Sequence, residues 1–155
     1  MRSTATAAEV TIRPATVSEL RRHGADLFAA SWAEIEGDGA LCVDWKQYGL
    51  LEDAGLLFVR SAWVGDEMVG YSVALALPGL HTSDLGGDLL SMFVKPECRR
   101  LGIGLRMIRE TQAWADDIGA KMRWHTKRGH TLDLVMRRLG YDEQDEIVYV
   151  KRGKP

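Results

Sequence analysis

A turn rich in glycine and arginine lies near the middle of the chain and has the composition of a phosphate site. From Val94 to Gly104 the chain reads VKPECRRLGIG, after an apolar segment and before residues at helical spacing. Such a turn directs backbone N–H groups and the positive end of a helix dipole toward one point. Gly102 and Gly104 remove side chains that would block a close approach, and Arg99 and Arg100 add positive charge. The turn therefore predicts a bound phosphate group.

The spacing within this turn argues against two common kinds of phosphate site. The pattern Gly-x-x-x-x-Gly-Lys-Ser/Thr of nucleoside triphosphate loops is missing, so kinase or GTPase chemistry is not expected. The third glycine of the dinucleotide fingerprint is missing as well, and the turn follows three segments predicted as antiparallel strands. A different phosphate-bearing ligand is indicated.

The same turn resembles a motif of the GNAT acetyltransferases, Arg/Gln-x-x-Gly-x-Gly/Ala, here Arg99 to Gly104. Three further segments are similar to the family: residues 12–15 look like its first strand, residues 69–71 like its third, and residues 139–141 like the Leu-Gly-Phe after its last helix. The resemblance covers nearly the whole domain. It implies acetyl-CoA as acyl donor, no metal, and transfer of the acetyl group to a primary amine on a small molecule, a lysine or an N-terminus.

The resemblance also implies which residues hold coenzyme A. In the family the diphosphate sits on backbone N–H groups of this turn, and the pantetheine arm lies along the preceding strand. The residues implied for the diphosphate are Arg100, Leu101, Gly102, Ile103 and Gly104, with Arg99 shaping the turn. Those implied for the pantetheine arm, through their main chains, are Met92, Phe93 and Val94, and one N–H of this strand would hold the oxyanion.

A base must remove a proton from the amine for the acetyl group to be transferred. Asp88 lies six residues before Val94, at a position where some family members carry a catalytic glutamate. It lies in phase with Leu90 and Met92, and a carboxylate in that apolar setting is expected to have a raised pKa. The alternative is a structural residue at a strand edge. His125 is a further candidate because histidine titrates near neutrality, although a structural or surface role is an alternative for it too.

The general acid is not evident from the sequence. Many relatives place a tyrosine four residues before the Gly-Phe pair, and counting back from Gly140 gives Met136, which cannot donate a proton. Tyr71, His125, His130 or water could substitute, or the thiolate could leave unassisted. The same departure supports an alternative function, a non-catalytic GNAT-fold module that binds acyl-CoA as a sensor or partner domain.

The acceptor is predicted from charge. Residues 15–94 carry 12 acids and 4 bases, whereas residues 95–155 carry 9 acids and 14 bases. In the family, acceptor recognition falls to the segment after the first helix and the loop before the central strand. The acidic and aromatic groups there suit a cationic amine; they include Trp32, Glu34, Glu36, Asp38, His81 and Asp84, with His81 a further candidate base.

These residues need a scaffold of alternating strands and helices. We expect an α/β single-domain fold over residues 11–155, after a flexible tail of residues 1–10, with a mixed, mostly antiparallel sheet of six to seven strands and about four helices. Strands are expected at residues 11–15, 56–64, 68–77, 88–94, 121–127 and 146–151, and helices at 18–35, with Ser18 as cap, 44–54, 104–118 and 131–139.

Composition sets the remaining expectations. At 155 residues, 46% hydrophobic and 27% charged, the chain suits one globular domain. Apolar runs such as residues 73–77 are too short for a membrane span, and the N-terminus lacks the apolar stretch of a secretory signal, so a cytoplasmic location is predicted. Cys42 and Cys98 show no ligand spacing, which predicts no metal. A net charge of −2 makes duplex nucleic acid an improbable partner. Oligomeric state is left open, a homodimer included.

Overall fold

The computed structural model describes residues 9–37 and 40–144. The chain divides into two compact units, one ending at His125 and one beginning at Thr126. The first unit contains the sheet, and the second contains the helix α5 (Thr131–Arg138). The strand predicted over residues 146–151 lies outside the described residues, as does most of the predicted tail.

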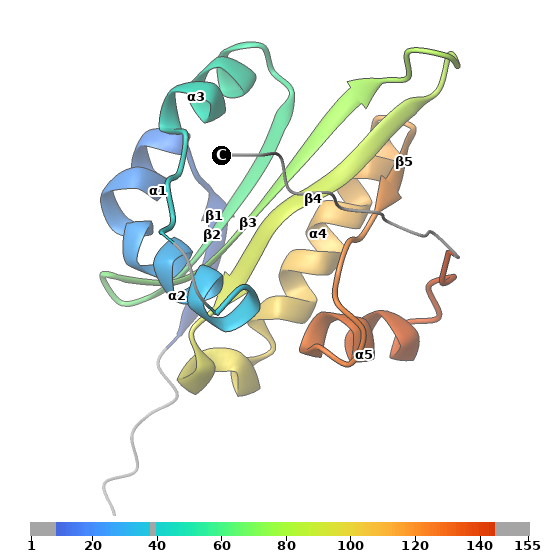
Figure 1. Cartoon of the computed structure of the whole chain (residues 1–155). Coiled ribbons are helices and arrows are strands. Elements are labelled where there is room, and N and C mark those ends of the chain that lie inside the picture. Colours follow the sequence, from blue (N-terminus) through green and yellow to red (C-terminus); the bar gives the residue numbers. More distant parts are fainter. Residues whose placement is uncertain (1–8, 38–39, 145–155) are drawn as a thin grey trace, which may run out of the picture. The chain divides into compact units, whose positions relative to one another are not determined.

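The sheet has five strands in the order β1-β2-β3-β4-β5 (Figure 1). The first four pair antiparallel, and β5 pairs parallel to β4. This confirms the predicted α/β class with a mixed, mostly antiparallel sheet. The described part of the chain contributes five strands, fewer than the six to seven expected. They are β1 (Val10–Pro14), β2 (Leu57–Val64), β3 (Glu67–Pro78), β4 (Leu85–Val94) and β5 (Ala120–Arg123).

Two helices replace the single helix predicted over residues 18–35. They are α1 (Val17–His23) and α2 (Ala25–Ile35), separated at Gly24. The amide of Gly24 donates to the carbonyl of Leu20 at 2.8 Å, and a Cβ at Gly24 would lie 2.9 Å from that oxygen. The chain can therefore bend tightly against the end of α1 because residue 24 has no side chain.

The cap of α1 also differs from the expectation. Thr16, not Ser18, precedes the first helical residue. Its hydroxyl accepts from the Glu19 amide at 3.1 Å, and the Glu19 carboxylate accepts from the Thr16 amide at 3.1 Å. This reciprocal pair satisfies two N–H groups that a helix start leaves unpaired. Asp44 caps α3 (Trp45–Asp53) in a similar way, through its 2.9 Å bond from the Gln47 amide.

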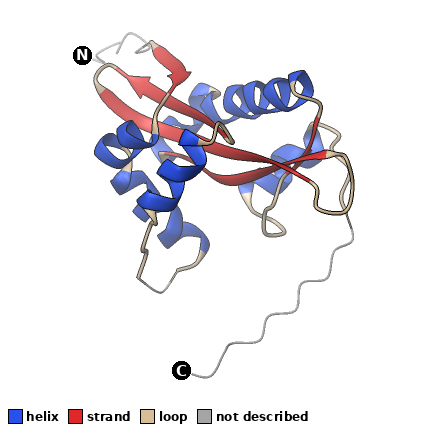
Figure 2. Cartoon of the chain, turned by 90° about the horizontal axis from the view of Figure 1, so that it is seen from above, coloured by secondary structure: helices blue, strands red, loops and turns tan. Residues whose placement is uncertain are grey.

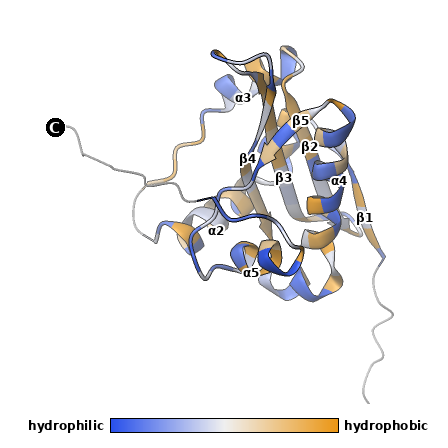
Figure 3. Cartoon of the chain, turned by 90° about the vertical axis from the view of Figure 1, so that its right-hand side faces the viewer, coloured by the Kyte–Doolittle hydropathy of each residue, from blue (hydrophilic) through white to orange (hydrophobic). Residues whose placement is uncertain are grey.

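The helices of the first unit cover both faces of the sheet (Figure 2). One core cluster joins β2, β3 and β4 to α1 and α2, and its buried members are Leu20, Leu27, Phe28, Val59, Met68, Tyr71, Val73 and Phe93. On the other face lies α4 (Ile103–Asp117), whose hydrophobic and hydrophilic residues alternate along its length (Figure 3). Its cluster contains Ala62, Val69, Val94, Ile103 and Met107. Burial against two separate helix layers fixes β3 and β4 at the centre of the fold.

A β-bulge interrupts the pairing of β3 with β4. Val73 pairs with Ser91, but the next residue, Ala74, pairs with Leu89, so Leu90 is an extra residue on β4. A one-residue insertion moves every side chain beyond it to the opposite face. The bulge therefore changes which residues of β4 share a side of the sheet.

Asp88 lies before this bulge, and its predicted phase is wrong for that reason. It pairs with Leu75 of β3, whereas Tyr71 on the same face of β3 pairs with Phe93. Paired residues of an antiparallel ladder point to the same side. Asp88 therefore shares a face with Tyr71 and Phe93, not with Met92 as the sequence alternation suggested.

The second unit is described by its own contacts. Within α5, Asp133 accepts from the Gly129 amide at 2.6 Å and pairs with Arg137 at 2.8 Å. Arg137 and Arg128 both pair with Glu143. These bonds connect the start of the helix to the segment that follows it. The predicted helix over residues 131–139 is confirmed to within one residue.

Candidate active site

Strand β4 has an open edge along its second half. Strand β5 pairs with it only from Leu85 to Asp88, through residues 120–123. From Leu89 to Val94, β4 has no strand on that side among the described residues. An open edge exposes backbone N–H and C=O groups that can pair with an extended ligand.

The amides that face this open edge can be identified from their neighbours. The Lys95 amide donates to the Val69 carbonyl of the β3 side at 2.9 Å. Backbone groups of a strand alternate in direction with a period of two, so the groups of Phe93 also point toward β3. Those of Met92 and Val94 point to the open edge. Of the three residues implied for the pantetheine arm, the geometry thus favours Met92 and Val94 for main-chain bonding.

The turn after β4 leads directly into α4 and is open to ligand. A short 3₁₀ helix, η1 (Pro96–Leu101), which the sequence pattern did not predict, occupies its first part. Gly102 follows in the left-handed region, with φ of 72°, and no side chain caps the start of α4. A Cβ at Gly102 or at Gly104 would meet no heavy atom within 4 Å. The first N–H groups of a 15-residue helix are therefore accessible to an anion.

Arg99 stabilises the junction between β4 and this turn. Its Nε donates to the Val94 carbonyl at 3.0 Å, and a terminal nitrogen pairs with the Glu34 carboxylate of α2 at 2.5 Å. Its guanidinium lies 5.5 Å from the centre of the Phe93 ring. The side chain is thus committed to protein groups, in keeping with a shaping role. Glu34, which is predicted to bind the acceptor, is a partner of Arg99 in this structure.

We expect the loss of the Arg99 side chain to weaken coenzyme A binding much more than the loss of its ion pair with Glu34 alone. Arg99→Gln should weaken acetyl-CoA binding about tenfold or more, because the Val94 carbonyl loses its donor and the turn loses its support. Glu34→Gln should change it less than threefold, since half-exposed ion pairs contribute little. Isothermal titration calorimetry on both variants checks the difference. Equal losses in the two variants would assign the effect to the ion pair.

Asp88 lies in a cluster with two residues of the β5 side. One carboxylate oxygen is 3.1 Å from Nε2 of His125, and the other accepts from Arg123 at 2.8 Å. Partial burial raises the pKa of Asp88, but the hydrogen bonds from Arg123 and His125 outweigh it, and the net pKa is lowered. The expectation of a raised pKa is therefore wrong. Asp88 and His125, which are separate candidates in the sequence, lie together in the structure.

Tyr71 lies in the core of the first unit. It is 0% exposed and stacks on Phe28 with ring centres 4.2 Å apart and planes 4° apart. Its hydroxyl is 2.8 Å from Oγ of Ser91. Burial raises the pKa of Tyr71 to about 12. A phenol so enclosed and so weakly acidic is better suited to packing than to protonating a thiolate.

Four of the six residues predicted for the acceptor, Trp32, Glu34, His81 and Asp84, do not gather in one place. Trp32 and Glu34 belong to α2, and Glu34 reaches Arg99 just beyond the C-terminal end of β4. His81 and Asp84 lie exposed in the turn between β3 and β4, before the first residue of β4. The two pairs are thus at opposite ends of a ten-residue strand, which spans roughly 30 Å. Glu36 is exposed, and Asp38 lies outside the described residues.

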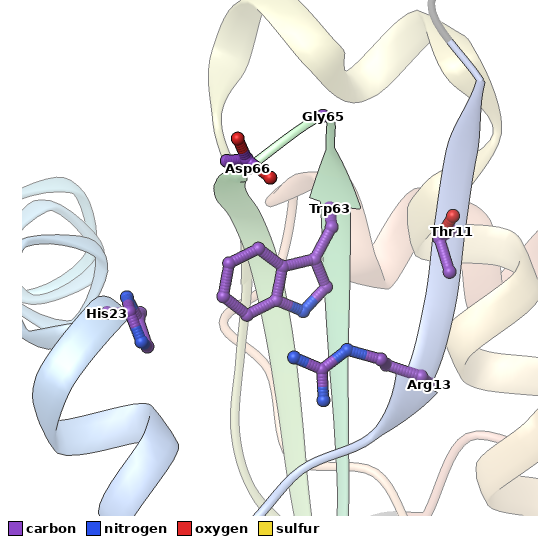
Figure 4. Close-up of a pocket in the computed structure, with 6 residues that line it drawn as sticks. All are labelled: Thr11, Arg13, His23, Trp63, Gly65 and Asp66. Carbon is purple, nitrogen blue, oxygen red and sulfur yellow. The ribbon is translucent and has the colours of Figure 1, made fainter.

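A hollow of about 460 Å³ lies over β1 and β2 (Figure 4). Its central feature is the Trp63 indole, with the Arg13 guanidinium 4.8 Å from its centre and the His23 ring 5.3 Å away. The other lining residues are Thr11, Gly65 and Asp66. Strand β1 is one edge of the sheet, and β4 lies three strands away. The hollow is therefore separate from the open edge of β4.

Within residues 9–37 and 40–144, no group of three or more histidine, cysteine, aspartate or glutamate side chains is arranged to hold a metal ion. No helix in those same ranges combines the length and the apolar character needed to cross a bilayer.

Arg123 is a site residue that the sequence analysis missed. It lies two residues before His125, so both side chains of an extended segment can reach the same carboxylate. This period-two spacing was visible in the sequence. What was not visible is the parallel register that places Arg123 opposite Asp88.

The chain belongs to the GNAT acetyltransferases. The model described as the acetyltransferase (GNAT) family matches residues 20–141, which include the open edge of β4 and the turn before α4. No protein in the curated collection searched matches the chain at a significant level.

Solved structures share the fold at low sequence identity. AAC(6')-Iy, in complex with the bisubstrate analogue CoA-S-monomethyl-acetylneamine, is 20% identical, with 94% of this chain and 99% of that chain covered and a TM-score of 0.74. A ribosomal-protein-alanine N-acetyltransferase from Brucella melitensis biovar Abortus 2308 is 18% identical, with 95% and 99% covered and a TM-score of 0.73. The aminoglycoside acetyltransferase meta-AAC0020 from an uncultured soil metagenomic sample, in complex with sisomicin, is 16% identical, with 94% and 97% covered and a TM-score of 0.71.

Proposed function

We propose that the protein is an acetyl-CoA-dependent N-acetyltransferase that acts on a primary amine. The observation that carries this proposal is the continuity of two binding elements. The open edge of β4 runs directly into a turn whose helix start is uncapped and free of side chains. A ligand with an extended, amide-containing arm and a diphosphate suits both elements at once.

Acetyl-CoA fits this arrangement from its diphosphate to its reactive end. The amides of residues 100–104 would hold the diphosphate, and Met92 and Val94 would pair with the arm through their main chains. Arg99 donates to the Val94 carbonyl at this same edge, so at Val94 the amide N–H is the group best placed to pair with the arm. The donor supplies an acetyl thioester. An arm that runs back along β4 brings that end toward the bulge at Leu90, near Asp88 and His125.

An amine acceptor is supported by charge and by the structural neighbours. The acid excess of residues 15–94 favours a cationic acceptor. The structural neighbours include aminoglycoside acetyltransferases in complex with sisomicin and with a bisubstrate analogue of acetylneamine, and a ribosomal-protein-alanine N-acetyltransferase. For this chain, the acceptor class we propose is a cationic small molecule or the amine of a lysine or N-terminus.

Thiol release tests this function. The protein is incubated with acetyl-CoA and a panel of polyamines, aminoglycosides, lysine peptides and peptides with free N-termini, and free CoA thiol is measured. Release that depends on at least one amine is the expected result. Activity only on hydroxyl or anionic acceptors would contradict the proposal.

The same assay separates the enzyme from a non-catalytic acyl-CoA sensor. That alternative rests on Met136, which occupies the position where many relatives carry a tyrosine that acts as general acid. Met136 is a buried residue of α5. A sensor would bind acetyl-CoA without releasing CoA thiol with any amine. Turnover would show that the reaction proceeds without a tyrosine at this position.

A further inference from the structure

The cluster of Asp88, Arg123 and His125 lies where β4 and β5 separate. Asp88 and Arg123 form the last residue pair of the parallel ladder, and His125 follows two residues later. The open edge of β4 begins at the next residue, Leu89. A group that pairs with these residues is therefore placed at the closed end of the proposed arm site.

Both oxygens of the Asp88 carboxylate are already engaged. One accepts from Arg123 at 2.8 Å and the other lies 3.1 Å from His125 Nε2. The side chain of Asp88 is 28% exposed, whereas that of His125 is 60% exposed. Of the two, the imidazole is the more accessible to an incoming amine.

The hydrogen bond determines which nitrogen of His125 carries a proton. An ionised carboxylate can only accept, so Nε2 of His125 must donate to Asp88. In the neutral ring the other nitrogen, Nδ1, then has a free lone pair. Arg123 also pairs with the Asp88 carboxylate. The negative charge of Asp88 is therefore balanced without a positively charged imidazole. A neutral imidazole with one nitrogen fixed and the other free is the arrangement of a general base.

We propose that His125 is the general base of the acetyl transfer and that Asp88 is a positioning residue that holds its ring. This inference rests on the proposed function. The lone pair of the acceptor nitrogen forms the C–N bond to the acetyl carbon, and Nδ1 takes the proton that the nitrogen loses. The C–S bond breaks with its electron pair on sulfur, and the thiolate takes a proton from the His125 imidazolium or from solvent.

Three variants test the assignment by steady-state kinetics. His125→Ala should lower kcat by roughly 100-fold or more with the KM for acetyl-CoA unchanged, and added imidazole should restore part of the activity. Asp88→Asn should cost less, about tenfold, because the ring remains but loses its orientation. His23→Gln, at the separate hollow over β1 and β2, is the control and should leave kcat unchanged.

A spectroscopic measurement on the ligand-free protein shows which nitrogen of His125 carries the proton and needs no turnover. The ¹⁵N chemical shifts of the His125 ring, measured at a pH where the ring is uncharged, should show Nε2 protonated and Nδ1 unprotonated. In Asp88→Asn this preference should weaken. The proton on Nδ1 in the wild-type protein would overturn the proposal.

The kinetic results can overturn it as well. A larger loss in Asp88→Asn than in His125→Ala would make the carboxylate the base. An inactive His125→Ala that binds acetyl-CoA normally but is not rescued by imidazole would also refute the assignment. If the wild-type protein turned over none of the amines, the proposed function itself would be contradicted. Calorimetry with CoA would then show whether the protein still binds the carrier, as a non-catalytic sensor would.

Discussion

Gly102→Asp is expected to weaken acetyl-CoA binding about 100-fold or more. Gly102 directly precedes α4 with φ of 72°, and its missing side chain leaves the first amides of the helix open. An aspartate there would place a negative charge about 4 Å from the diphosphate, where like charges at an effective dielectric of 20 repel by roughly 4 kcal/mol. Isothermal titration calorimetry on the folded variant measures the loss.

Two controls separate charge from backbone strain. Gly102→Ala adds the cost of a side chain at positive φ, about 1–2 kcal/mol, without the charge. Gly119→Asp makes the same substitution at a glycine with φ of 71° at the other end of α4. Gly119→Asp should leave the affinity for acetyl-CoA unchanged. Equal affinities for Gly102→Asp and the wild type would exclude the turn as the diphosphate site.

Phe28→Ala is expected to lower the free energy of unfolding by roughly 3–5 kcal/mol. The Phe28 ring is 6% exposed and stacks on Tyr71, with Trp45 and Tyr48 at 5.1 and 6.2 Å between ring centres. Its removal leaves a cavity between α2, α3 and the sheet. Urea unfolding followed by fluorescence and circular dichroism measures the change.

Phe58→Ala is the matched comparison on the opposite face of the sheet. Phe58 stacks on Trp114 of α4 at 4.9 Å, but its side chain is only partly buried. We expect a loss of roughly 1–2 kcal/mol, since less apolar surface returns to water. A loss at Phe58 as large as that at Phe28 would show that the aromatic cluster around Tyr71 is not the main core of the first unit.

The helices and strands were predictable where hydrophobic periodicity and glycine signals agree. Helix α4 and the β2–β3 hairpin follow directly from residues at helical spacing and from an alternating run broken by a Gly-Asp-Glu turn. The break at Gly24 was not predicted because an isolated glycine within a helical pattern is tolerated and does not by itself end a helix. The close contact of Gly24 with the Leu20 carbonyl, which explains the break, is visible only in the structure.

The diphosphate turn was predictable because its function depends on backbone positions that glycine marks. Gly102 and Gly104 are recognisable from the sequence, and the structure leaves both open. The acceptor residues were not predictable in the same way. Glu34 pairs with Arg99 across 65 positions of sequence, and only the folded chain brings them together.

Asp88 shows how one inserted residue defeats an alternation argument. Its face depends on the bulge at Leu90, and its pKa depends on Arg123, which a parallel strand brings opposite it. A bulge in β4 leaves no signal in the sequence, because apolar residues such as Leu89, Leu90 and Met92 occur at successive positions around it and show no alternation that the insertion could interrupt. The face and the pKa of Asp88 therefore depend on the pairing of distant strands, which the local sequence pattern does not reveal.

A crystal structure of the protein with coenzyme A tests the central claim most directly. The account predicts electron density for the diphosphate on the amides of residues 100–104, and for the arm along Met92 and Val94 of β4. Density for the carrier at any other place, or crystals that exclude it at saturating concentration, would contradict the account.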